Sequence, residues 1–210
     1  MLLPRSFYAR PTLDVAADLL GKVLVHRGRA GTTAGIIVEA EAYIGEQDPA
    51  CHAAAGPTRR NQPMYGEPGH AYVYLNYGVH FLFNIVTEPE GSPAAVLIRA
   101  LQPVDGIGIM RRRRASRRGA RSVQDHDLCR GPGNLTRAMG ITIRDNHADL
   151  CGGRLFLEDR GVPAGEVLWG PRIGIAAGTD LLWRCCLAGS PTVSGRRPIR
   201  GHPRPQVTRC

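Results

Sequence analysis

The chain has 210 residues with 18 acidic and 27 basic side chains, of which Lys22 is the single lysine, and its formal net charge is +9. This length suits one domain that can bury a sizeable core. A hydrophobic fraction of 43% argues against intrinsic disorder outside the ends. No apolar run approaches the roughly 20 residues of a transmembrane helix, and the N-terminus lacks the apolar core of a signal peptide. We therefore expect a soluble, cytoplasmic protein that does not contact membranes.

Basic charge is concentrated in the second half of the chain. The first 100 residues carry 8 basic and 9 acidic side chains, whereas the remaining residues carry 19 and 9. The stretch from Arg111 to Arg121 holds seven arginines and no acid, and five further arginines follow Ser194. This asymmetry is typical of a protein that binds a polyanion. We interpret the stretch as a phosphate-contacting segment, with a solvated charge run as the alternative, and residues 190–210 as a flexible basic tail.

Six cysteines are spread along the chain, and none of them forms a C-x-x-C pair. The adjacent Cys185 and Cys186 have a poor spacing for chelating a metal ion. We therefore expect buried free thiols, with neither a disulfide framework nor a metal site.

The first predicted elements are a helix and two strands. Thr12 can cap a helix that follows Pro11 and ends at Gly21, and residues 22–26 are typical of a strand. The next strand alternates, which places on one face Ile36, Val38, Ala40 and Ala42, and on the other Ile37, Glu39, Glu41 and Tyr43. We expect the first face to pack and the second to present two carboxylates and a ring.

A long loop and a hairpin follow. Residues 45–70 are rich in Gly, Pro and polar groups, and long loops in compact domains are usually functional. This loop contains His52, Arg59, Arg60 and Asn61. The runs 71–75 and 79–86 are aromatic and β-branched, and they flank the sequence Asn-Tyr-Gly, which predicts a β-hairpin with Tyr77 at its tip.

Shorter elements are predicted for the rest of the chain. We expect a strand over Ala94–Ala100, a helix beyond Pro103, and a second short helix opened by the Gly-Pro-Gly turn within Asp127–Gly140. Strand-like segments follow at Arg154–Leu157 and Arg172–Ala176.

Several side chains allow both a structural and a chemical interpretation. Tyr77 is either an exposed ring lying on a neighbouring loop or a wedge that inserts between stacked bases. Glu39 and Glu41 either face solvent, or one of them lines a polar pocket as a general base. Arg99 is either a surface arginine or the group that keeps Glu41 ionised. The aromatic walls of such a pocket, which would hold a flat ring by stacking, would come from Tyr43, His52 and Tyr72 or Tyr74.

The order and spacing of several motifs are similar to those of one known family. The motifs are Leu19-Leu20-Gly21-Lys22-Val23-Leu24, Glu39-Ala40-Glu41-Ala42-Tyr43, Asp48-Pro49-Ala50-Cys51-His52-Ala53, Arg60-Asn61, Pro68-Gly69-His70-Ala71-Tyr72-Val73-Tyr74, Asn76-Tyr77-Gly78, Leu97-Ile98-Arg99-Ala100-Leu101, Asp127-Leu128-Cys129-Arg130-Gly131-Pro132-Gly133-Asn134-Leu135 and Pro171-Arg172-Ile173-Gly174-Ile175. On these motifs the chain resembles the alkyladenine (3-methyladenine) DNA glycosylase family, and the resemblance covers roughly residues 3 to 185. The dense arginine stretch, the Cys185-Cys186 pair and the tail depart from the family's usual pattern.

The resemblance implies a fold and a set of site residues. The fold would be mixed α/β (α+β), a single domain over residues 1–189 with a curved antiparallel β-sheet, flanking helices and a β-hairpin that enters the DNA minor groove. The matching residues would be Glu41 and Arg99 for the attacking water, Tyr43, His52 and Tyr74 for the base sandwich, Asn84 for the pocket floor and Tyr77 for intercalation. The resemblance further implies DNA-backbone contacts by Arg59, Arg60 and Arg130, and a water positioned by the backbone of Ile173.

The resemblance also implies the reaction. Glu41 would activate a water that hydrolyses the N-glycosidic bond of a flipped purine such as 3-methyladenine, 7-methylguanine or hypoxanthine, leaving an abasic site. Because Lys22 and the N-terminus are the only amines available for a Schiff base, we expect a monofunctional enzyme. No cofactor or metal is implied, and the partner would be double-stranded DNA with damaged purines, bound by a monomer.

Two other functions stay open from the sequence. One is a non-catalytic module that binds damaged DNA or structured RNA with the same wedge and basic face. The other is a hydrolase or transferase of small nucleosides, which would need neither the arginines nor Tyr77.

Overall fold

The computed structural model describes residues 1–115, 123–195 and 204–205. Parts of the predicted arginine stretch and of the predicted tail therefore lie outside the described residues. The helices are α1 (Arg5–Tyr8), α2 (Thr12–Leu19), α3 (Ile107–Arg114) and α4 (Pro132–Met139), with short 3-10 turns at His52–Ala55, Gln62–Tyr65, Asp125–Asp127 and Ile143–Asp145. The strands are β1 (Val23–Gly28), β2 (Gly31–Ile44), β3 (Ala71–Asn76), β4 (His80–Val86), β5 (Ala94–Asp105), β6 (Leu155–Glu158), β7 (Val167–Gly170) and β8 (Arg184–Leu187).

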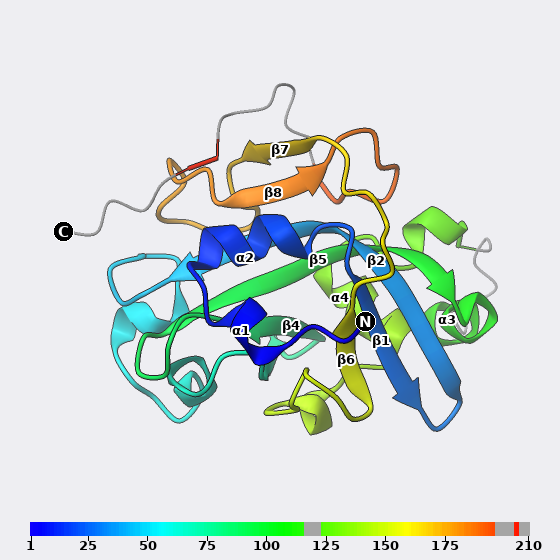
Figure 1. Cartoon of the computed structure of the whole chain (residues 1–210), viewed down its shortest axis with the longest axis horizontal. Helices are drawn as coiled ribbons and strands as arrows, with labels where there is room; N and C mark the ends of the chain where they lie inside the picture. The colour runs from blue at the N-terminus through cyan, green and yellow to red at the C-terminus, as the bar shows by residue number, and fades with distance from the viewer. Residues whose placement is uncertain (116–122, 196–203, 206–210) are drawn as a thin grey trace.

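These strands form one curved sheet of eight antiparallel strands (Figure 1). The order is β3-β4-β5-β2-β1-β6, and β8 pairs with both β2 and β7. The long strand β2 is central: its first half pairs with β1, its residues 39–41 pair with β8, and β5 runs along its other edge. The backbone of β2 at residues 39–41 is therefore flanked by β5 on one side and β8 on the other.

Helices flank the sheet, which confirms the predicted mixed α/β class. The face covered by α2 (Figure 1) forms the main core, to which α2 contributes Leu13, Val15, Ala16 and Leu19. Helix α4 buries Leu135, Ala138 and Met139, and its Thr136 hydroxyl donates to the Phe81 carbonyl of β4 at 2.7 Å. Both helices thus fix the strands that carry the hairpin and the central carboxylates.

A β-bulge changes which side chains of β2 and β5 face each other. Between Glu39 and Ala40 the partner on β5 changes from Ala100 to Ile98, so Arg99 is an extra residue on β5. A second register shift occurs one step earlier, on β2 itself. Bulges re-aim side chains locally and are common beside active sites.

The bulge also makes the predicted division of faces wrong. Ile37 shares the main core with Ala40 and Ala42, whereas Ile36 packs in a different cluster. A one-residue shift moves side chains to the opposite face of a strand, and an uninterrupted alternation cannot represent it. Glu39 and Glu41 do not face solvent, because both are fully buried.

Two local predictions need correction. Thr12 is not the cap of α2 but its first residue, and its backbone N–H donates to the Glu88 carboxylate at 2.8 Å. A carboxylate distant in sequence thus satisfies the helix N-terminus. The predicted strand over Arg172–Ala176 is wrong: this segment is a loop, and the strands nearby are β7 and β8.

Other predictions are confirmed in outline. The hairpin β3–β4 pairs from Ala71 with Ile85 to Asn76 with His80. The helix after the Gly-Pro-Gly turn is α4, with Pro132 in its first turn. The described cysteines are free, and all are buried except the half-buried Cys151.

The packed domain continues past the boundary predicted at residue 190. Thr192, Val193 and Ser194 are buried, and Ser194 hydrogen-bonds to side chains of β2 and β5. Among the helices of the described part of the chain, none has the length and apolar character needed to cross a bilayer.

Candidate active site

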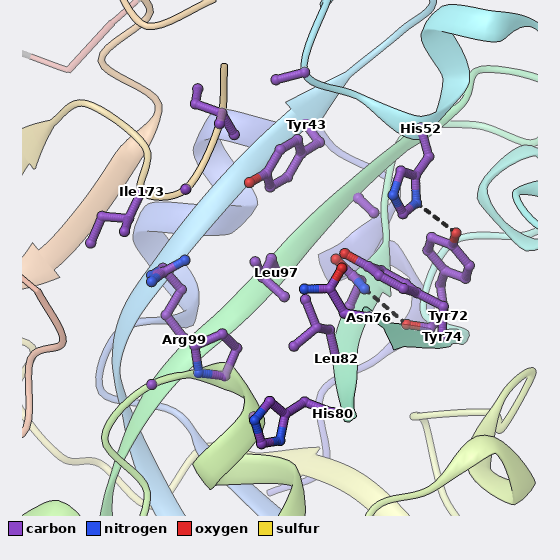
Figure 2. Close-up of a pocket in the computed structure, with 18 of the residues that line it drawn as sticks. Tyr43, His52, Tyr72, Tyr74, Asn76, His80, Leu82, Leu97, Arg99 and Ile173 are labelled. Carbon is purple, nitrogen blue, oxygen red and sulfur yellow. Dashed lines mark hydrogen bonds between the residues drawn. The ribbon is translucent and has the colours of Figure 1, made fainter. Parts of the chain in front are cut away.

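A cavity of about 530 Å³ opens between the hairpin β3–β4, strand β5, the end of β2 and two loops. Its lining, part of which is labelled in Figure 2, combines aromatic, apolar and polar side chains. The lining residues are Tyr43, Ala50, His52, Met64, Tyr72, Tyr74, Asn76, Tyr77, His80, Leu82, Asn84, Ala95, Leu97, Arg99, Gly131, Pro132, Gly133, Asn134, Ile173, Gly174 and Ile175. This volume lies within the range typical of small-molecule sites.

Three aromatic rings form one wall of the cavity. The centroids of the His52 and Tyr74 rings are 4.5 Å apart, and His52 Nδ1 lies 2.8 Å from the Tyr72 hydroxyl (Figure 2). Burial, with a smaller effect of the Arg60 charge, lowers the pKa of His52 from its ordinary value of 6.5. The neutral imidazole is therefore favoured at neutral pH.

The loop that carries His52 is held in place by a buried amide. The Asn61 side chain donates to the carbonyls of His52 and Gly56, each at 2.8 Å, and accepts from the Thr58 N–H at 2.6 Å. These bonds satisfy backbone groups of the loop that have no partner strand. They fix the backbone from which His52 enters the cavity.

Asn84 of β4 lies in the cavity wall with Leu82 and Leu97. Its amide donates to the Tyr72 carbonyl at 3.0 Å and is buried, so its orientation is fixed by the neighbouring strand β3. An amide held among apolar side chains can distinguish ligand edges by their donors and acceptors.

Glu41 is buried directly behind the inner end of the cavity, where three residues of the cavity lining hold it. One carboxylate oxygen accepts the Ile173 N–H at 2.8 Å, and the other accepts the Tyr43 hydroxyl at 2.8 Å and an Arg99 N–H at 3.2 Å. In Figure 2 Arg99 and Ile173 lie on the left of the cavity, across from His52 and Tyr72. An ionised carboxylate has about four acceptor positions, so these three donors leave room for one more.

A buried ion pair supports Tyr43 from behind. Arg172 and Asp48 are bridged by two bonds of 2.6 and 2.7 Å, and both side chains are fully buried. The Arg172 guanidinium lies 4.7 Å from the centroid of the Tyr43 ring. Burial and the Glu41 charge raise the pKa of Tyr43 far above its usual value, which keeps its hydroxyl a donor.

The hairpin tip lies at the opposite end of the cavity. The Tyr77 side chain lines the cavity mouth and yet is 90% exposed. Tyr77 and Gly78 have φ values of +48° and +69°, as in the type I′ turns that join tight hairpins. A positive φ is uncommon for a bulky residue, so the turn presents this ring at a conformational cost.

The loop before α4 completes the mouth. A Cβ atom on Gly133 would come within 2.7 Å of the His80 ring, so only glycine allows this loop to approach the hairpin so closely. Arg130, at the start of this loop, donates to the Val193 carbonyl at 3.1 Å and pairs with Asp127.

The predicted backbone-binding arginines differ in their surroundings. Arg59 is exposed, and Arg60 lies with its guanidinium 4.9 Å from the Tyr74 centroid. Arg130 is half-buried and bonded within the protein. Arg60 therefore contacts a ring of the cavity wall. Arg130 contacts Asp127 and Val193, which do not line the cavity.

All predicted pocket residues are brought together, and further residues lie among them that were not predicted. Glu41, Arg99, Tyr43, His52, Tyr74, Asn84, Tyr77 and the Ile173 backbone surround or border the cavity. The additional ones include Asn76 and the Gly131–Asn134 loop, which lie within quoted motifs but had no assigned role, and His80, which lies in the predicted second strand of the hairpin. Among the described residues, no group of three His, Cys, Asp or Glu side chains could hold a metal ion.

Comparisons with known proteins identify the family. The model of the methylpurine-DNA glycosylase family matches residues 6–191. A relative from Methanocella arvoryzae, named "Putative 3-methyladenine DNA glycosylase", is 52% identical over 201 residues, covering 94% of this chain and 98% of the relative. Relatives of the same name from Prosthecochloris aestuarii and Burkholderia lata are 47% and 46% identical over 197 residues, covering 93% and 92% of this chain and 92% and 91% of those proteins. The chain therefore belongs to the methylpurine-DNA glycosylase family of DNA repair hydrolases.

Proposed function

We propose that this DNA glycosylase flips alkylated or deaminated purines out of duplex DNA and hydrolyses the N-glycosidic bond with a water activated by Glu41, leaving an abasic site. The observation that carries the proposal is the position of Glu41. It is a fully buried carboxylate at the inner end of an aromatic cavity, held by the Arg99 guanidinium. The names of the relatives support 3-methyladenine as one of the bases released.

The cavity is suited to an electron-poor purine. Aromatic walls attract a cationic ring by a cation–π interaction of roughly 0.5 to 2 kcal/mol, and Tyr43 and Tyr74 offer such rings. A neutral His52 adds no charge repulsion against a cationic base. Damaged or mispaired bases also cost less to extrude from the stack. The preference for damaged purines would therefore be the sum of several small free-energy contributions.

Glu41 would act on a water at its remaining acceptor position. The carboxylate would take the proton as the water oxygen bonds to the sugar carbon and the C–N bond breaks. A cationic alkylated purine leaves as a neutral base, and the Glu41 charge would also stabilise positive charge on the sugar. Hydrogen bonds from Arg99 and the Ile173 N–H would hold the carboxylate in this orientation.

The positions of the two amines support a monofunctional reaction. Lys22 Nζ lies 2.6 Å from the Asp159 carboxylate, and the N-terminal amine donates to the Asp159 carbonyl at 2.8 Å. Neither amine is among the described residues that line the cavity. A Schiff base, and the strand cleavage that follows it, would require an amine at the sugar.

The exposed Tyr77 supports duplex DNA as the substrate. Its ring is at the tip of a hairpin beside the cavity mouth, where it could fill the space of the extruded nucleotide. Insertion of a side chain offsets unstacking, which costs roughly a few kcal/mol per step. A small nucleoside would not need this residue.

The test is single-turnover release of free base from methylated duplex DNA, with strand breakage scored before and after alkali. Glu41→Gln keeps the shape of the side chain but cannot accept a proton. We expect release to fall by roughly 10²- to 10⁴-fold, with duplex affinity retained. The control is Glu67→Gln, an exposed residue that does not line the cavity, which should behave as the unchanged protein.

Other outcomes would change the assignment. Equal release by both proteins would place the base elsewhere. Tight binding of damaged duplex without any release would favour the non-catalytic recognition module. Strand breakage before alkali, with a product trapped by borohydride, would contradict the monofunctional reaction.

A further inference from the structure

A second buried carboxylate, Glu39, lies next to the Glu41–Arg99 pair. One Glu39 oxygen accepts from Arg184 Nε at 2.7 Å and lies 3.4 Å from Arg99 Nε. All four side chains are buried, with exposures between 0% and 7%. Two carboxylates and two guanidiniums therefore share one region enclosed by β2, β5 and β8, and their charges balance.

The chain segment after β8 closes this group. The Ser194 N–H donates to the other Glu39 oxygen at 2.7 Å, and the Ser194 hydroxyl accepts from Arg99 Nη2 at 3.3 Å. The Ser194 carbonyl accepts from Arg184 Nη2 at 3.3 Å. Ser194 thus contacts Glu39, Arg99 and Arg184. It lies beyond residues 6–191, which the family model matches.

The bulge explains how Arg99 reaches both carboxylates. As the extra residue on β5, Arg99 stands where the register shifts between Glu39 and Ala40. From there it directs Nη1 at Glu41, Nη2 at Ser194 and Nε toward Glu39. The orientation of Arg99 is therefore determined by three groups, and only one of them is the proposed general base.

We propose that Glu39, Arg184 and Ser194 are positioning residues that hold Arg99 against Glu41 and balance the charge beside it. The proposal rests on the proposed role of Glu41. None of the three lines the cavity among the described residues, and Glu39 and Ser194 contact its lining through Arg99, so they act on the reaction through Arg99. Glu39 places a second negative charge beside Glu41, and the Arg184 guanidinium balances it.

Other groups also face Glu41 and stay constant in the test. They are Tyr43 on the same strand, Tyr74 on β3, Arg172 in the loop after β7 and Cys185 on β8. The Arg172 charge is already paired with Asp48. Substitutions confined to Glu39 and Arg184 therefore test the charge balance among the two carboxylates and the two guanidiniums.

The experiment measures single-turnover base release, with duplex affinity measured in parallel, for full-length Glu39→Gln and Glu39→Gln/Arg184→Gln. Glu39→Gln removes the charge that accepts from Arg184 and faces Arg99 Nε. The double variant removes one charge of each sign and so keeps the charge of the group balanced. Both should release base at least about tenfold more slowly, because Arg99 is misplaced, with unchanged duplex affinity.

Matched variants separate charge from folding. Asp18→Asn changes the net charge equally but at an exposed site paired with Arg10, and it should leave both rate and duplex affinity unchanged. Ser194→Ala removes only the hydroxyl that accepts from Arg99, and slower release at unchanged affinity is expected. If Glu39→Gln does not fold, Ser194→Ala still tests the positioning role.

The contrary outcomes are distinct. A wild-type rate in Glu39→Gln or in Ser194→Ala would overturn the positioning role, and so would a loss of duplex affinity as large as the loss of rate. Glu41→Gln measured alongside separates the two proposals: if it is inactive while the other variants show no effect, only the positioning role fails. If Glu41→Gln is fully active, the proposed function fails first.

Discussion

The two ends of the cavity are built in opposite ways. At the inner end, Glu41 is fully buried and accepts three hydrogen bonds, from Ile173, Tyr43 and Arg99. At the outer end, Tyr77 is 90% exposed and Val79 is 69% exposed, on a turn with a positive φ at a tyrosine. At the inner end the protein supplies hydrogen-bond donors to a buried charge, whereas at the outer end it leaves two large side chains exposed.

The difference indicates what each end is for. A buried charge is tolerated only when it is paired and hydrogen-bonded, so the inner end requires fixed geometry, which also suits a general base. An exposed aromatic ring at a tip gains little from the folded protein, but it gains contact area when another molecule covers it. Substitutions at the inner end should therefore affect stability and chemistry, and substitutions at the tip should affect only the encounter with DNA.

The largest effect is expected from breaking the buried pair behind Tyr43. Asp48→Asn leaves the Arg172 charge without its counter-ion, and loss of one partner in a buried pair costs roughly 3 to 5 kcal/mol. We expect the free energy of unfolding, measured by urea denaturation, to fall by about 3 kcal/mol. Asp149→Asn breaks the exposed pair with Arg5 and should cost less than about 1 kcal/mol. Equal losses in free energy of unfolding for the two variants would show that the buried Asp48–Arg172 pair contributes no more than an exposed pair.

A smaller effect is expected at the tip. Tyr77→Ala should leave the free energy of unfolding unchanged within about 0.5 kcal/mol. Base release from duplex DNA should fall by about tenfold to a hundredfold, because the ring no longer offsets an unstacking cost of a few kcal/mol. Release from single-stranded DNA is the control and should be unaffected. A similar loss on both substrates would assign Tyr77 to the cavity rather than to the duplex.

The smallest effect is expected at the wall between the two ends. Burial lowers the pKa of His52 below its ordinary value of 6.5, so below pH 6.5 the unfolded chain binds a proton that the folded protein resists. The stability from neutral His52 is therefore fully present above pH 6.5 and is lost as the pH falls through the folded-state pKa. His52→Gln should lose less stability than the unchanged protein between pH 7.5 and pH 5.5, as measured by urea denaturation. The exposed His80→Gln is the control, and the same pH dependence in both variants would contradict the expectation.

Local signals in the sequence were sufficient for the hairpin and for α4. The Asn-Tyr-Gly turn between two aromatic runs predicts the β3–β4 hairpin, because a tight turn needs residues that accept positive φ. The Gly-Pro-Gly sequence predicts the start of α4, because Pro132 suits a first helical turn. Both depend on contacts within a few residues. The strand β8 was missed, because its short run Arg184–Leu187 has no alternation that distinguishes it from a loop.

The sequence by itself determined the hairpin with its exposed tyrosine and, by resemblance, the fold class and the residue types of the pocket. Only the tertiary structure decided that Glu39 and Glu41 are both buried, that Arg99 reaches both, and that Ser194 contacts Glu39 and Arg99 from beyond the predicted domain boundary. The physical reason is distance along the chain. Turns and helix starts depend on neighbouring residues, whereas the burial of a charge depends on partners more than fifty residues away, such as Arg99 for Glu41.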